Sequence, residues 1–172
     1  MSSLTRKGFA GLALAATIAV GCGGGDDAAT SAADRRTIAA LDADGVPGEL
    51  NGLSVVRENI SDTIEAARRP YLDAAVFFSI REEQTLQATL QIGRFANDVD
   101  AADEDFQATL LAAIGGAGVK ELRMGENRVW LSTGDRQQIA VWFTADDVYI
   151  LSTRDDYEFP RSLLRAALEV RP

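Results

Sequence analysis

The chain has 172 residues and a formal net charge of −9 at pH 7, with 26 acidic and 17 basic side chains. An acidic protein repels the phosphate backbone of nucleic acids, so the composition argues against DNA or RNA as a partner. There is no histidine and only one cysteine, which excludes Ser-His-Asp and Cys-His catalysis and the zinc sites built from Cys and His.

The first 22 residues have the layout of a secretory signal. Arg6 and Lys7 precede an uncharged apolar run, residues 9–20, which ends at Gly21 and Cys22. This run is too short to cross the hydrocarbon core of a membrane, which requires about 20 apolar residues as a helix. The sequence therefore predicts that residues 1–21 are a signal peptide, removed during export.

Residues 19–22, Ala-Val-Gly-Cys, resemble the lipobox of bacterial lipoproteins, although Ala19 stands where leucine is more usual. The resemblance covers residues 1–22 only. It implies that fatty acyl chains such as palmitate are attached at Cys22, which becomes the first residue of the mature protein. Two or more such chains anchor a protein firmly. The resemblance thus implies a protein of the cell envelope, anchored in the cell membrane on its extracytoplasmic face, which is the periplasmic side if an outer membrane exists. The other interpretation of Cys22 is a stray thiol in an ordinary cleaved leader.

The remaining chain is expected to consist of a tether and one domain. Residues 22–45 are mostly small and polar, as in a flexible linker, although residues 34–41 could form a short helix. Residues 46–172 are numerous enough to bury one hydrophobic core without disulfides. We therefore place the boundary of the folded domain at Val46.

Hydrophobic patterning predicts an α+β domain, with an antiparallel sheet of about six strands and helices packed mainly on one face. Alternating polarity over residues 86–92 predicts a strand that pairs with residues 74–81 in a hairpin. Residues 86–114 and 148–170 share the order strand, acidic segment, helix, which suggests two related halves. The other expected elements are an extended segment at 53–56, helices at 62–69, 104–114 and 160–170, and a meander of strands at 119–124, 128–133, 137–144 and 148–153.

Two acidic stretches can be compared with a calcium-binding loop, and neither fits. In residues 98–109, Asp103 stands where the loop needs glycine and Thr109 where it needs glutamate. In the stretch that starts at Asp42, Leu53 stands at the last ligand position. We expect the first stretch to be a solvated loop whose acids favour the positive end of the following helix. The sequence assigns no catalytic residue, no metal ligand and no cofactor.

Aromatic side chains in the expected meander form the one candidate binding surface. Trp142 points away from the face that carries Ile139, Val141 and Phe143, and it can share its face with Tyr149. This face is either a second hydrophobic surface covered by residues 46–56, or an exposed surface for a ligand or partner. The candidate residues are Trp130, Trp142 and Tyr149.

The sequence favours a lipid-anchored binding or protein-interaction module of the cell envelope over an enzyme. The alternative is a small envelope hydrolase that uses Asp or Glu carboxylates, which requires two or more acids in one cleft. For the binding module, the expected partners apart from the membrane are another envelope protein or a small ligand. A flat aromatic face would favour a protein partner, and a pocket would favour a small ligand.

Overall fold

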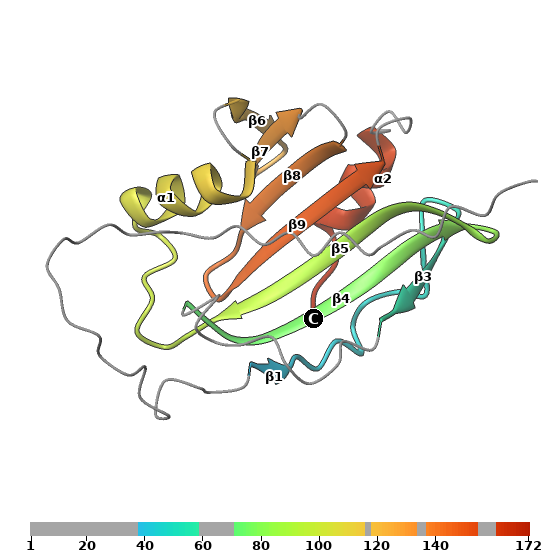
Figure 1. Cartoon of the computed structure of the whole chain (residues 1–172), viewed down its shortest axis with the longest axis horizontal. Coiled ribbons are helices and arrows are strands. Elements are labelled where there is room, and N and C mark those ends of the chain that lie inside the picture. Colours follow the sequence, from blue (N-terminus) through green and yellow to red (C-terminus); the bar gives the residue numbers. More distant parts are fainter. Residues whose placement is uncertain (1–37, 59–70, 116–117, 134–136, 155–160) are drawn as a thin grey trace, which may run out of the picture.

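The computed structural model describes residues 38–58, 71–115, 118–133, 137–154 and 161–172. Within these ranges the chain forms one nine-stranded sheet and two helices (Figure 1). The strand order is β2-β3-β4-β5-β9-β8-β7-β6, and β1 pairs with β4 outside this path. The predicted antiparallel sheet is confirmed, but the fold is dominated by the sheet and has more strands than the six expected.

A long hairpin of β4 (Leu72–Glu82) and β5 (Thr85–Phe95) lies near the middle of the sheet. Val76 lies opposite Ile92 and Phe78 opposite Leu90, so apolar side chains meet on one face. Glu83, at the tip, has a φ of 51°, which closes the turn between the strands. The hairpin predicted from the alternation of residues 86–92 is confirmed, and both strands are longer than expected.

The second half of the sheet is an antiparallel meander, as predicted. Its last strand, β9, also pairs with β5 in antiparallel orientation, which joins the meander to the hairpin. Gly125 has a φ of 64° in the turn between the first two strands of the meander. The strands are β6 (Lys120–Met124), β7 (Asn127–Thr133), β8 (Gln137–Phe143) and β9 (Asp147–Arg154).

The two helices cover opposite faces of the sheet. Leu110 and Leu111 of α1 (Glu104–Gly115) pack in one cluster, with Val141 and Val148 among others. Residues of α2 (Arg161–Leu168) pack in a second cluster that contains the alternate strand residues. In Figure 1, β5 and β9 pass in front of α2. Both helices were predicted, but their placement mainly on one face was wrong, because β8 and β9 are apolar on both faces and each face needs a cover.

This placement also bears on the suggested repeat. β5 and β9 are antiparallel neighbours, so a two-fold axis that relates them runs perpendicular to the sheet and keeps each face on its own side. Such an axis would place α1 and α2 on the same face. The buried clusters place them on opposite faces, so the described residues do not form two symmetric halves.

The folded body begins earlier in the chain than Val46. β1 (Ala39–Ala40) pairs in parallel with β4, and the N–H of Leu41 donates to the carbonyl of Ala75 at 3.0 Å. Leu41 and Ala43 are buried. The expected tether therefore ends before residue 39. A short helix was expected at residues 34–41, but residues 39 and 40, which the structure describes, form a strand. A two-residue strand is too short to show a hydrophobic period, which is why residue patterning did not reveal it.

The next two strands, β2 (Glu49–Leu50) and β3 (Leu53–Arg57), extend the sheet beyond β4. Asn51 and Gly52 join them with φ values of 52° and 80°. The extended segment expected at 53–56 is confirmed as part of β3. The signal peptide, Cys22, the tether up to residue 37 and the helix expected at 62–69 lie outside the described residues. None of the helices in the described ranges is long and apolar enough to span a membrane.

Candidate functional site

The three candidate aromatic residues do not lie on one surface. Trp142 and Tyr149 are 1% and 0% exposed, and their rings stack with centroids 5.1 Å apart. Trp130 pairs with Val141 in the sheet, so it lies on the opposite face, which carries α1. There it contacts Phe143 edge to face at 5.3 Å. Because successive residues of a strand point to opposite faces, Trp130 and Trp142 cannot form a common binding surface.

The stacked pair, Trp142 and Tyr149, lies in the main core. The same cluster contains Leu41, Leu50 and Leu53 from the N-terminal segment. It also contains Leu163, Leu164, Ala167 and Leu168 from α2. Of the two alternatives for this face, the structure thus shows a covered hydrophobic surface. Both α2 and residues within 46–56 cover it.

Within the described residues, this core holds buried polar atoms that lack a hydrogen-bond partner. Among the described residues, Trp142 Nε1, Tyr149 Oη and Thr153 Oγ1 are buried without a hydrogen bond. An unsatisfied buried polar group costs about 1–3 kcal/mol, so each one needs a reason. Burial raises the pKa of Tyr149 above its ordinary value, and Asp147 adds to the rise, while Arg171 and Arg94 oppose it. The charges of these three side chains therefore influence the pKa of the Tyr149 hydroxyl.

Two of these charged groups form a fixed pair at the end of β5. Arg94 Nε lies 3.0 Å from Asp147 Oδ1, and Arg94 Nη2 lies 3.3 Å from Asp147 Oδ2. The Asp147 side chain is 7% exposed, whereas that of Arg94 is 46% exposed. The hydrogen bonds to Asp147 are the main reason why the pKa of Arg94 is raised. The pair holds one edge of the guanidinium and leaves its Nη1 donors free of any bond within the described residues.

An open cleft of about 260 Å³ lies beside Arg94, lined also by Asp42, Asp44, Gly45 and Pro172. The N-terminal segment and the residues after α2 approach closely at this point. A side-chain carbon on Gly45 would lie 2.5 Å from the carbonyl oxygen of Arg171, so the approach requires glycine. The cleft is therefore built from three parts of the chain that are far apart in sequence.

In the part of the chain that the structure describes, the charges on the two sides of this cleft are not paired with each other. Asp42 and Asp44 are exposed, and Asp42 Oδ1 accepts a weak bond of 3.4 Å from the N–H of Asp44. In the described ranges, neither carboxylate forms an ion pair. The segment that carries them is held in place by Arg57, whose Nη2 donates to the carbonyl of Leu41 at 2.8 Å. Two exposed carboxylates, neither of which forms an ion pair with another described residue, thus line the cleft together with a half-exposed guanidinium.

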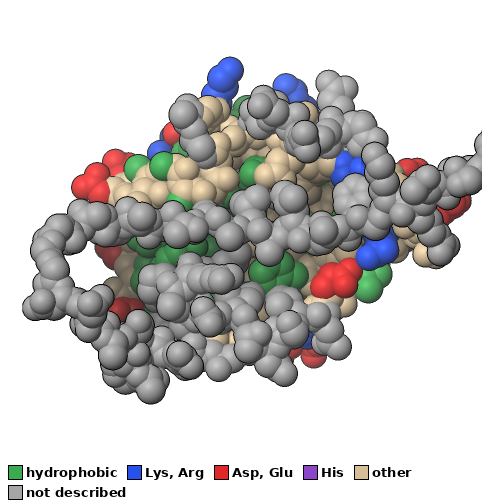
Figure 2. Space-filling model, in the orientation of Figure 1, with side chains coloured by type: hydrophobic (Ala, Val, Ile, Leu, Met, Phe, Trp, Pro, Cys, Tyr) green, Lys and Arg blue, Asp and Glu red, His purple; other side chains and the backbone are tan. Residues whose placement is uncertain are grey.

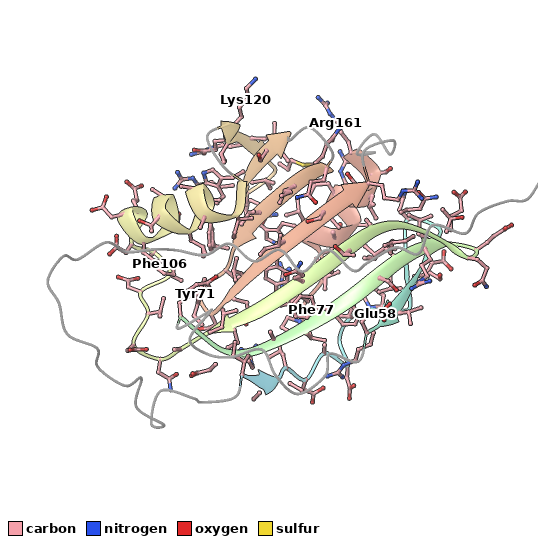
Figure 3. The ribbon with its side chains drawn as sticks, viewed as in Figure 1. Glu58, Tyr71, Phe77, Phe106, Lys120 and Arg161 are labelled. Carbon is pink, nitrogen blue, oxygen red and sulfur yellow. The ribbon has the colours of Figure 1, made fainter. Side chains whose placement is uncertain are left out.

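A small hollow lies on the face that carries α1. It lies between α1 and the hairpin, and its free volume of about 10 Å³ is roughly that of one water molecule. Green hydrophobic side chains are visible beside α1 on this face in Figure 2. Tyr71 and Phe106 meet edge to face at 6.1 Å next to the start of α1, while Phe77 lies over β4 (Figure 3). The hollow does not have room for a ligand.

The acidic loop before α1 caps the helix. Asp103 Oδ1 accepts hydrogen bonds from the N–H groups of Asp105 at 2.9 Å and Phe106 at 3.3 Å. Asp100 Oδ1 accepts one from the N–H of Ala102 at 2.9 Å. The bonds to Asp103 are those of a helix N-terminus, as the sequence led us to expect, and the bond to Asp100 closes a turn in the preceding loop. Among the described residues, no group of three or more Cys, Asp or Glu side chains is placed to hold a metal ion.

A comparison of the chain with protein-family models, with curated proteins and with solved structures finds no match. The cleft must therefore be interpreted from its residues. Sequence reasoning considered Asp42 and Asp44 only as calcium ligands and did not single out Arg94. A signal was present, because Arg94 continues the inward register of Leu90 and Ile92, and Asp147 continues that of Tyr149 and Leu151. Where the inward-facing positions of two neighbouring strands change from apolar residues to residues of opposite charge, the sequence indicates the edge of the core and an ion pair there.

Proposed function

We propose that this protein is an exported, lipid-anchored binding protein of the bacterial cell envelope, which takes a small ligand in the cleft beside Arg94. The anchor rests on the leader that ends at Cys22. The observation that carries the binding function is the cleft itself, which is lined by charges of both signs that do not pair across it within the described residues. Charged groups at a concave site that keep donors or acceptors to spare favour a ligand that supplies partners for them.

The positions of the aromatic residues favour a small ligand over a protein partner. The sequence left open an exposed aromatic face, which would suit a protein surface. Trp142 and Tyr149 are instead enclosed in the core, and Trp130 is half-buried between α1 and the sheet. The large hydrophobic side chains that are exposed in the described part, Val56 and Leu86, are single and belong to different strands. They do not form the extended apolar patch of an interface.

The second candidate function is that of an envelope hydrolase, because two aspartates line the same cleft. A carboxylate pair acts as acid and base when the two groups have different surroundings. Asp42 and Asp44 are both exposed and sit two residues apart on one segment. This arrangement suits the binding of a positive group better than it suits proton transfer.

The anchor is tested by replacing Cys22 and following the protein in the cells that export it. Cys22→Ser should release the protein from the membrane fraction, while the unaltered protein stays there and is extracted only by detergent. The matched control introduces the same side chain farther along the expected tether, as Thr30→Ser, and should leave the protein in the membrane. Retention of Cys22→Ser with unchanged mass would overturn the anchor.

A further inference from the structure

The charges of the cleft define the chemical class of its ligand. Asp42 and Asp44 accept hydrogen bonds and favour a positive group, whereas Arg94 can only donate and favours a negative one. Because Asp147 occupies Nε and one Nη2 donor of Arg94, the guanidinium is held in one orientation and keeps donors to spare. A ligand that uses both kinds of group carries an ammonium and an anionic group a short distance apart.

We infer that the cleft binds a small zwitterion, a free amino acid or short peptide, with its ammonium at Asp42 and Asp44 and its carboxylate at Arg94. The volume of about 260 Å³ suits a molecule of this size and is below that of most sites for drug-sized ligands. This inference rests on the binding function proposed above, and it names the ligand class of the same site.

The walls of the cleft are tied to the body of the fold. Arg94 is held by two hydrogen bonds to Asp147, and the segment that carries Asp42 and Asp44 is held by the bond from Arg57 to the carbonyl of Leu41. Arg171 precedes Pro172 in the cleft wall and donates through Nη1 to the carbonyls of Leu168 and Val170. The cleft is therefore lined by residues from three segments, each of which is hydrogen-bonded to another part of the chain or to the end of α2.

The test uses the full chain in detergent and titration calorimetry with three matched probes. L-Alanyl-L-alanine carries both charges, its N-acetyl derivative lacks the ammonium, and its carboxamide lacks the carboxylate. We expect the unmodified dipeptide, or a free amino acid from a panel of the twenty, to bind. Each blocked derivative should bind at least about tenfold more weakly, the effect of losing one charge-assisted hydrogen bond.

Variants assign the two ends of the ligand. Asp42→Asn with Asp44→Asn should weaken the zwitterion at least about tenfold and leave the N-acetyl probe unchanged. Glu82→Gln with Glu83→Gln, at the exposed tip of the hairpin, makes the same change in net charge and should not alter binding. Arg94→Lys keeps a positive charge beside Asp147 but loses the planar fork, so it should weaken the probes that carry a carboxylate and not the carboxamide.

Three results would overturn the inference. They are the absence of binding by any amino acid or by the dipeptide at millimolar concentrations, equal binding of the carboxamide, which would indicate a site for cations only, and binding that the Asp42 and Asp44 changes do not affect. The mass of the same preparation shows separately whether Cys22 is acylated. A failed anchor with intact zwitterion binding, or the reverse, can therefore be told apart.

Discussion

The two faces of the sheet differ in how completely they are covered. On the face of α2, Tyr149, Leu151 and Leu163 have no exposed surface. On the face of α1, Phe106, Trp130 and Phe143 are only partly buried, and a small hollow lies between α1 and the hairpin. The face that carries Trp142 and Tyr149, two of the three residues that the sequence offered as a binding surface, is the better-sealed core. Aromatic content alone therefore does not distinguish a binding face from a core in a sheet that is apolar on both sides.

Polar groups are found on the better-covered face as well. On the α2 face, polar atoms without a hydrogen-bond partner among the described residues lie in the core, and the pair of Arg94 and Asp147 lies at its margin. The cleft occurs at that margin, where the registers of β5 and β9 change from apolar residues to Arg94 and Asp147. The binding site we propose thus lies at the edge of the well-covered core on the α2 face. It is not an opening in the less covered α1 face.

The largest loss of stability should come from removing a large side chain from the core on the α2 face. Trp142→Ala removes a fully buried indole that stacks on Tyr149, and we expect a loss of about 4 kcal/mol in the free energy of unfolding. Trp130→Ala on the other face should cost about half as much, because part of the indole already contacts water. Urea unfolding of both variants measures the difference. Equal losses would show that the two faces are sealed alike.

The next effect should come from the margin of the sealed face. Arg94→Gln leaves the nearly buried Asp147 without its partner, and we expect a loss of about 1–2 kcal/mol, reduced because Arg94 is 46% exposed and water can replace part of the contact. Arg94→Lys should recover much of it. Arg128→Gln breaks a pair of similar geometry with Glu121 that lies on the surface, and it should leave the urea midpoint unchanged. An unchanged midpoint for Arg94→Gln as well would mean that Asp147 does not depend on the pair.

A smaller effect, in the opposite direction, is expected at Tyr149. Tyr149→Phe removes a buried hydroxyl that has no partner among the described residues, so the variant should be as stable as the parent or more stable by up to about 1 kcal/mol at neutral pH. The pKa of Tyr149 is raised in the folded state, mainly by burial, so the unfolded chain ionises first as pH rises. The parent should therefore lose stability as the pH rises from the ordinary tyrosine pKa, about 10, through the raised value, and the variant should lack this component. Stability measured against pH from neutral to alkaline tests both parts, and a clear loss at neutral pH would show that the hydroxyl has a partner after all.

The smallest effect belongs to the α1 face of the hairpin. Hydrogen bonding from Ser79, followed by Arg81, lowers the pKa of Glu58 despite some opposing desolvation. A lowered pKa stabilises the fold above the ordinary glutamate value and loses this contribution as pH falls through the folded-state value. Because Glu58 is half-exposed, Glu58→Gln should cost less than about 0.5 kcal/mol at neutral pH and nothing at acidic pH. Thermal unfolding at the two pH values measures this, and a loss that persists in acid would assign Glu58 a role in packing.

Local pattern predicted much of this fold, and non-local contact decided the rest. The alternation in β5 and the spacing of Phe106, Leu110 and Ile114 in α1 are properties of short segments, and both elements were found as expected. The face on which each helix lies depends on contacts with distant strands, which no single segment encodes. The cleft depends on the approach of Gly45 to Arg171 and of Arg94 to Asp147, so its members could be noticed as charged residues but not brought together.

The anchor at Cys22 is the central claim about where this protein acts, and the intact mass of the protein extracted from its native membrane tests it most directly. The account predicts a chain that has lost residues 1–21 and begins at Cys22, with added mass that corresponds to a diacylglyceryl group and a further acyl chain. A chain that retains the leader, or one that is cleaved but carries an unmodified thiol, would contradict it.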